Sequence, residues 1–253
     1  MARAVAHCPT NLAVPPLGRL GLRSCAMIID SHTHISRPGA VVNIDPVSLP
    51  ARGFRFMDDR YYSAGIHPWN AGCFTKRDVD RLRRLAFDPH VTAIGETGLD
   101  SVHVAYELVD NGRGKEAVQA LPDIEKQMEL LRLHVQLSEE AGKPLLLHIV
   151  KRYPEIQKLH ADLRPRQPWV IHGFRGRPGL AADLLRQGFY LSYGERFNPA
   201  SVEVTPPGRM LAETDESAVP FEEIVASLPV TPAVSLPDLA LGHCAEDPQA
   251  WHA

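Results

Sequence analysis

The sequence lacks the features that mark several classes of protein. In its 253 residues no apolar run approaches the roughly 18–20 residues of a membrane-spanning helix, so we expect no membrane association. Its four cysteines (Cys8, Cys25, Cys73 and Cys244) form no CxxC pair, which favours a reducing compartment and predicts a cytoplasmic protein. The net charge of -3 provides no basic excess for coating nucleic acid, although it does not exclude an enzyme that holds phosphate through metal ions.

The amino-terminal segment lacks acidic residues and differs from the rest of the chain. Residues 1–26 contain no Asp or Glu, and Pro15, Pro16 and Gly18 interrupt their apolar stretch, so the continuous core of a secretory signal is missing. We expect a disordered extension over 1–26 and a single domain over 27–253. Within that domain, residues 101–120 are expected to form an inserted loop with little pattern, and about 240–253 an irregular tail.

After residue 26, short apolar runs alternate with segments of helical periodicity. The predicted strands are residues 27–35, 40–44, 61–67, 91–98, 144–150, 169–174, 189–194 and 209–215. The predicted helices are residues 76–87, 124–141, 154–163, 177–187 and 221–228. Eight strands with intervening helices favour a (β/α)8 TIM barrel. We expect the barrel to be somewhat abbreviated, because the links after the second strand and after Gly194 are Pro-rich; an open doubly wound sheet is the structural alternative.

Histidines and carboxylates lie where the predicted strands end. The strand period of two puts His32 and His34 on one face, where both imidazoles can reach the same metal ion. Such a pair alone is a weak signal in a chain with 12 histidines, and a core histidine bonded to the backbone would explain any single case. The later strand ends carry Glu96, His148, His172 and, in the last one, Glu213 and Asp215. Because barrel enzymes carry their active sites at the carboxyl ends of the strands, this ordered set predicts one shared metal site.

Seven motifs extend this pattern through the chain from residue 28 to about residue 225. They are Ile29-Asp-Ser-His-Thr-His34, Gly65-Ile-His-Pro-Trp69, Gly95-Glu-Thr-Gly-Leu-Asp100, Lys143-Pro-Leu-Leu-Leu-His148, Ile171-His-Gly-Phe-Arg-Gly176, Tyr190-Leu-Ser192 and Glu213-Thr-Asp215. In these motifs and their order, the sequence resembles the TatD family of metal-dependent hydrolases, which belongs to the amidohydrolase-like barrels. Members of that family are divalent-metal barrels, and several are deoxyribonucleases with 3′-to-5′ exonuclease activity.

The resemblance implies two divalent metal ions, Mg, Mn or Zn, and a water activated between them. It implies six metal ligands: His32, His34 and Asp215 at one ion, His148 and His172 at the other, and Glu96 as the bridge. A carboxylate suits the bridging position because its two oxygens can bind two cations about 3.5–4 Å apart. Glu96 and Asp215 are therefore the candidate catalytic residues, with Asp215 placed to orient or deprotonate the water.

The surroundings of the ligands depart from the family's pattern. Ser101-Val102 begins a longer insertion in place of aromatic residues and a short link, and Gly173 stands where a Cys is usual. The resemblance places His67 near the substrate and not among the ligands. Lys151 and Arg175 follow metal-bearing strand ends and are candidate phosphate contacts. The resemblance therefore predicts the class of reaction, metal-dependent hydrolysis, better than it predicts the substrate.

Three functions are compatible with the sequence. The first is a phosphodiesterase of TatD type, a 3′-to-5′ exonuclease acting on single-stranded or frayed DNA. The second is a dinuclear-metal hydrolase of a small amide, lactone or ester, which the acidic net charge favours. The third is a non-catalytic barrel that binds a metal or a partner, suggested by the irregular tail. The oligomeric state is not predicted.

Overall fold

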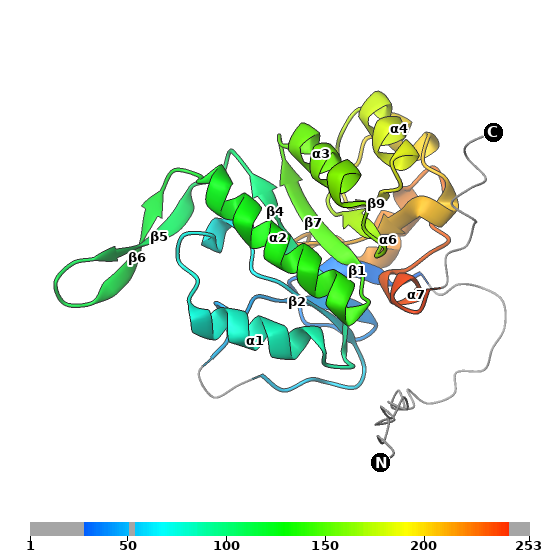
Figure 1. Cartoon of the computed structure of the whole chain (residues 1–253). Helices are drawn as coiled ribbons and strands as arrows, with labels where there is room; N and C mark the ends of the chain where they lie inside the picture. Colours follow the sequence, from blue (N-terminus) through cyan, green and yellow to red (C-terminus); the bar gives the residue numbers. More distant parts are fainter. Residues whose placement is uncertain (1–27, 51–53, 243–253) are drawn as a thin grey trace, which may run out of the picture.

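A computed structural model describes residues 28–50 and 54–242, and a sheet of eight parallel strands forms its centre (Figure 1). In sheet order the strands are β1 (Asp30–Thr33), β2 (Ala40–Ile44), β3 (Tyr61–Ala64), β4 (Val91–Asp100), β7 (Leu145–Val150), β8 (Trp169–Ile171), β9 (Tyr190–Tyr193) and β10 (Met210–Ala212). Each of the eight predicted strands is present. The expected extension over 1–26 and most of the expected tail lie outside the described residues.

The first and last strands meet at a short seam that nearly closes the sheet into a barrel. Thr33 and Asp215 form a parallel bridge, in which the Asp215 amide donates to the carbonyl of His32 at 2.9 Å. Next to it, the Asp30 carboxylate accepts hydrogen bonds from the amide and the hydroxyl of Thr214 at 3.0 and 2.7 Å. The prediction of a TIM barrel is confirmed, and the open doubly wound sheet does not describe the protein.

Helices cover the outer face of the barrel in the second half of the chain more completely than in the first (Figure 1). The α-helices are α1 (Lys76–Ala86), α2 (Ile124–Ala141), α3 (Tyr153–Leu163), α4 (Pro178–Arg186), α5 (Pro199–Glu203), α6 (Phe221–Ser227) and α7 (Leu236–Ala240). The described residues between β2 and β3 contain no helix, which accounts for the abbreviated barrel. In the described ranges, no helix combines the length and the apolar character that crossing a bilayer requires.

The barrel interior is apolar at the amino ends of the strands and polar at their carboxyl ends. Val41, Leu146, Val170 and Leu211 belong to one buried cluster, which also contains residues of α7. Side chains two positions apart in a strand point to the same side. The residues that follow these four at a spacing of two are therefore directed to the interior as well, and they are Asn43, His148, His172 and Glu213. The alternation that fills the core thus also positions the polar groups.

Residues 101–120 are inserted between β4 and α2, but they do not form a loop with little pattern. They contain an antiparallel hairpin of β5 (Ala105–Asp110) and β6 (Lys115–Ala120), which extends away from the barrel (Figure 1). Asp110 pairs with Lys115 around a turn that contains Asn111 and Gly112. Asn-Gly favours tight turns because glycine adopts positive φ easily, and Gly112 has a φ of 77°.

Candidate metal centre

The carboxylate of Glu96 lies at the centre of the six candidate ligands, and its two oxygens face different groups of histidines. The side chain is 3% exposed and comes from β4. Oε2 lies 3.4 Å from His32 Nε2 and 3.3 Å from His34 Nε2. Oε1 lies 2.9 Å from His148 Nδ1 and 2.8 Å from His172 Nε2. The arrangement therefore has two halves that share one carboxylate.

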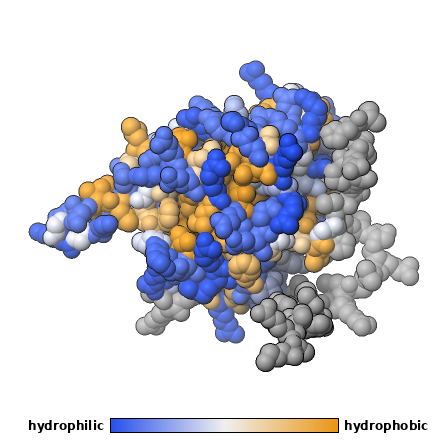
Figure 2. All heavy atoms as spheres, viewed as in Figure 1, coloured by the Kyte–Doolittle hydropathy of each residue, from blue (hydrophilic) through white to orange (hydrophobic). Residues whose placement is uncertain are grey.

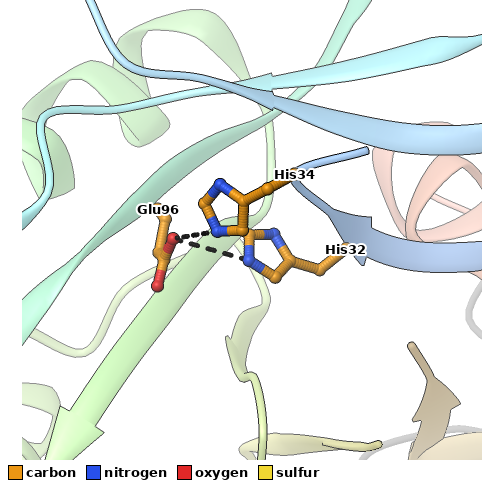
Figure 3. Close-up of side chains that lie close together, drawn as sticks. All are labelled: His32, His34 and Glu96. Carbon is orange, nitrogen blue, oxygen red and sulfur yellow. Dashed lines mark ion pairs between the residues drawn. The ribbon is translucent and has the colours of Figure 1, made fainter. Parts of the chain in front are cut away.

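The half around Oε2 is built by the seam of the barrel. In Figure 3 the imidazoles of His32 and His34 both point from the end of β1 toward Glu96. Asp215, which bridges β10 to β1, places its Oδ1 3.7 Å from His32 Nε2 and 3.5 Å from His34 Nε2. Two imidazoles and two carboxylates from three strand ends thus surround one small space.

The half around Oε1 depends on the close approach of β4 to β7. Gly98 pairs with His148, and a Cβ atom at Gly98 would collide with the His148 carbonyl oxygen. A glycine at this position therefore lets the two strands lie close enough for Glu96 and His148 to meet. His148 Nδ1 and His172 Nε2 are 3.1 Å apart, so two ring nitrogens converge on the same oxygen of Glu96.

The donor set fits a divalent metal ion. His32 is fully buried, yet neither of its ring nitrogens has a hydrogen-bond partner among the described residues. A buried polar atom without a partner is costly, and an ion in this space would satisfy Nε2. The ligand atoms of His32, His34 and Glu96 lie within 4.8 Å of one another, as do those of His32, His172 and Asp215. Imidazole and carboxylate together suit Zn, Mn or a similar divalent ion.

Two further carboxylates hold the histidines in place. Asp100 Oδ2 lies 3.2 Å from His148 Nε2 and accepts a hydrogen bond from the Trp69 indole at 2.9 Å. Glu213 Oε1 lies 3.2 Å from His172 Nδ1 and accepts from the Gly173 amide at 2.7 Å. Each carboxylate takes the ring nitrogen that points away from Glu96, which leaves the other nitrogen as the candidate ligand atom.

Asn43 of β2 also holds Glu96 in place, through contacts with its backbone and its carboxylate. Its side-chain oxygen accepts from the Glu96 amide at 3.0 Å, and its side-chain nitrogen lies 3.4 Å from Oε2. The same oxygen of Asn43 accepts from the Ser63 hydroxyl at 3.0 Å. Both the backbone and the carboxylate of Glu96 are therefore held by one side chain.

In this cluster, neighbouring charges and burial shift the pKa values of Glu96 and His172 in opposite directions. Burial would raise the pKa of Glu96, but the imidazoles of His172, His67 and His32 and the hydrogen bond from His148 hold it well below its ordinary value. Burial likewise opposes the charged form of His172, but the carboxylates of Glu96 and Glu213 raise its pKa well above the ordinary value. Glu96 is therefore an anion at neutral pH, which is the form in which a carboxylate binds a metal ion.

A cavity of about 360 Å³ opens above the cluster. It is lined by His34, Asn43, Asp45, Ser48, His67, Trp69, Asn70, Glu96, Tyr106, His148, His172, Asp215 and Glu216. No lysine or arginine lines it in the part of the chain that the structure describes. Ion binding at the base of the cavity would therefore supply most of its positive charge.

The three predicted substrate contacts occupy different places. His67 Nε2 lies 3.3 Å from Glu96 Oε1, and with Glu96 and His148 this histidine also forms a group that could hold a metal ion. Arg175 lines a second cavity of about 240 Å³, which shares Asp215 and Glu216 with the first. Lys151 is exposed directly after β7 and does not line either of these cavities.

Sequence reasoning named the strand-end acids but missed the roles of several supporting residues. Asn43 and Asp45 were not singled out, although a polar residue in the apolar run at 40–44 was a usable signal. Asp45 accepts from the His67 amide at 3.3 Å and from the Asn70 side chain at 2.8 Å, and so holds the turn after β3. Asp100 and Glu213 were quoted within motifs, yet nothing in the sequence showed that they support histidines.

Comparison with known proteins adds a family and several relatives. The family model described as TatD related DNase matches residues 51–228. The uncharacterized metal-dependent hydrolase YcfH of Escherichia coli K12 is 30% identical over 167 residues, 62% of this chain and 56% of the relative. The 3′-5′ ssDNA/RNA exonuclease TatD of Enterobacter lignolyticus is 29% identical over 162 residues, 60% of this chain and 56% of the relative. The chain thus spans just over half the length of these two curated relatives.

A solved structure supports the fold. The crystal structure of YjjV, a TatD homologue from Escherichia coli K12, matches with a TM-score of 0.57 and 20% sequence identity. The match covers 85% of this chain and 87% of that chain. At this identity the likeness concerns the barrel and not its chemistry.

Proposed function

The chain belongs to the family of TatD-related DNases, and on that premise we propose that it is a divalent-metal-dependent phosphodiesterase that removes nucleotides from the 3′ end of single-stranded or frayed DNA. One observation carries the proposal: the two oxygens of Glu96 face two separate groups of histidines. This is the arrangement that a pair of cations sharing one carboxylate requires. A relative named as a 3′-5′ exonuclease supports the choice of substrate.

In this proposal six side chains hold two ions. His32, His34 and Asp215 would bind one, His148 and His172 would bind the other, and Glu96 would be the ligand shared by both. When bound, such ions supply Lewis-acid polarisation of a phosphoryl oxygen and lower the pKa of a water molecule. Imidazole ligands favour Zn or Mn, whereas phosphodiester chemistry often uses Mg.

The protein's own groups position and accept protons. Asp215 is 32% exposed on the cavity side, so its carboxylate can orient a water and take its proton. His67 Nδ1 accepts from the Trp69 amide at 3.3 Å, which places the ring hydrogen on Nε2, toward the base of the cavity. Burial lowers the pKa of His67, so the ring is neutral, with its Nε2 hydrogen facing Glu96 Oε1 at 3.3 Å, and we propose that the ring contacts substrate from the cavity wall. Arg175 and Lys151 are proposed contacts for phosphates outside the metal cavity.

A nuclease assay with a matched variant tests the proposal. Purified protein is incubated with 3′-labelled single-stranded DNA and Mg, Mn or Zn, and label release is followed beside metal content. We expect stepwise release from the 3′ end by the wild type and none by Glu96→Gln. Absence of release with all three metals, under conditions where an active relative cuts, would refute nuclease activity.

A second candidate is a hydrolase of a small amide, lactone or ester. It is favoured by the lack of lysine and arginine around the metal cavity among the described residues, since a neutral substrate needs no cationic clamp. A panel of such substrates distinguishes the two functions. If one of them exceeds DNA in kcat/KM by orders of magnitude, the second function replaces the first.

A further inference from the structure

The β5–β6 hairpin contributes to the cavity that holds the candidate metal centre. The hairpin belongs to the insertion that replaces the short aromatic link expected after Asp100, and its Tyr106 lines the cavity together with Trp69 and His67. In Figure 2 apolar residues gather at the base of the hairpin, whereas its tip is hydrophilic. The base includes Val104, 40% exposed, and Leu121, 85% exposed.

The hairpin is fixed to the barrel at the level of Tyr106. Gly72, in the turn after β3, forms a parallel bridge with Glu107, and its carbonyl accepts from the Leu108 amide at 3.4 Å. The Glu107 carboxylate also accepts from Lys126 of α2 at 2.8 Å. A Cβ atom at Gly72 would lie 2.5 Å from the Tyr106 carbonyl oxygen, so only glycine permits this contact.

Of the two large aromatic side chains on this wall, Trp69 is already engaged. His103 stacks on its ring with centroids 3.5 Å apart and planes at 14°, and its indole nitrogen donates to Asp100. Tyr106 is 38% exposed, and in the described part of the chain its ring has no aromatic neighbour and its hydroxyl no hydrogen-bond partner. Tyr106 therefore presents a ring that a ligand can cover.

We propose that Tyr106 is the stacking platform for the terminal base of a single-stranded nucleic acid whose last phosphodiester lies over the metal centre. This deepens the proposed function and rests on it. A cavity of about 360 Å³ suits one terminal nucleotide rather than a duplex. Because no described lysine or arginine lines the cavity, affinity for the nucleotide must come from the metal centre and from the base, and base–aromatic stacking is the sequence-tolerant way to bind a base.

The test compares Tyr106→Ala and Tyr106→Phe on oligonucleotides whose 3′ residue either carries a base or is abasic. With a base present, Tyr106→Ala should raise KM about 10-fold with kcat changed much less, whereas Tyr106→Phe keeps the ring and should stay near wild type. With the abasic end, the difference between wild type and Tyr106→Ala should shrink to less than about twofold, because stacking is lost in both. Fluorescence anisotropy with an uncleavable terminal linkage should show the same pattern in Kd.

A second pair of variants tests the position of the hairpin. Gly72→Ala should displace Tyr106 and reproduce the Tyr106→Ala pattern, while Gly179→Ala, where a Cβ atom meets nothing within 4 Å, should behave as wild type. An equal KM for base-bearing and abasic ends in an active wild-type enzyme would overturn the role of Tyr106 and leave the nuclease function standing. An inactive wild type with all three metals would instead remove the nuclease function. In that case, equal Kd values for the two ends would overturn the stacking role independently.

Discussion

The metal centre and the β5–β6 hairpin lie on the same cavity but are built in opposite ways. The candidate centre is assembled from the ends of separate strands, and buried carboxylates hold two of its histidines: Asp100 contacts His148 and Glu213 contacts His172. The hairpin is a local pairing of neighbouring residues, fixed by a few contacts near Gly72 and Lys126. Catalysis needs the rigid geometry of the candidate metal centre. A contact that selects the substrate, as we propose for Tyr106 of the hairpin, tolerates more variation in the segment that carries it.

Removing the shared carboxylate should give the largest effect. Glu96→Gln takes away the anion that both halves of the centre face, and we expect kcat to fall about 10³-fold, with lower metal content. Activity and elemental analysis on one preparation measure this. Glu216→Gln, which changes an acid on the same cavity but outside the six proposed ligands, is the control and should retain most of the metal. Equal losses in the two variants would contradict a central role for Glu96.

The barrel beneath the centre should be sensitive to acid. His134 of α2 is fully buried, accepts from the Ile66 amide at 2.9 Å, and has a pKa lowered by burial to about 4. The unfolded chain then binds more protons between pH 6.5 and pH 4, so stability falls as the pH drops through this window. The full contribution of this residue is about 3 kcal/mol.

Denaturant unfolding at several pH values measures this loss of stability. In His134→Gln the side chain cannot titrate, so the pH dependence should become smaller. An unchanged pH dependence in the variant would show that other groups cause it.

Asp100 joins the two regions, because one of its oxygens contacts His148 while the other accepts from the amides of Val102 and His103 at the start of the insertion. Asp100→Asn should weaken metal affinity or activity about 10–100-fold, the range typical of residues that orient a metal ligand. Calorimetric titration with metal and steady-state kinetics report the two effects. A normal metal affinity would mean that the backbone alone positions His148.

Replacing residues 104–121 by a short Gly-Ser link should have the smallest effect on the metal centre. We expect metal stoichiometry to stay at the wild-type value, because none of the six candidate ligands lies in this segment. In the intact protein, hydrogen exchange should be faster in β5 and β6 than in β4 and β7, since an isolated two-stranded pairing is marginally stable. Slow exchange in the hairpin would show that it is as firmly held as the barrel.

The same contrast explains how far sequence reasoning reached. The eight strands and the helix over 124–141 follow from local apolar patterns, and the motif glycines fall where strands approach closely, as Gly98 does beside His148. The hairpin was missed because its strands are short and polar, although Asn111-Gly112 is a turn signal. The strand pattern alone does not separate Glu96 from Asp100 or Asp215 from Glu213, because the register of neighbouring strands decides which acid lies near the histidines; only the family resemblance singled out Glu96 and Asp215.

The seam between β1 and β10 also determines when, during synthesis, the chain can complete its candidate metal centre. Thr33 and Asp215 are 182 positions apart, yet the contact that closes the ring also delivers the sixth candidate ligand. A nascent chain on the ribosome carries the other five ligands before Asp215 emerges, but it has neither a closed ring nor a complete ligand set. We therefore expect a product of stalled translation that ends before β10 to bind divalent metal more weakly than the full chain.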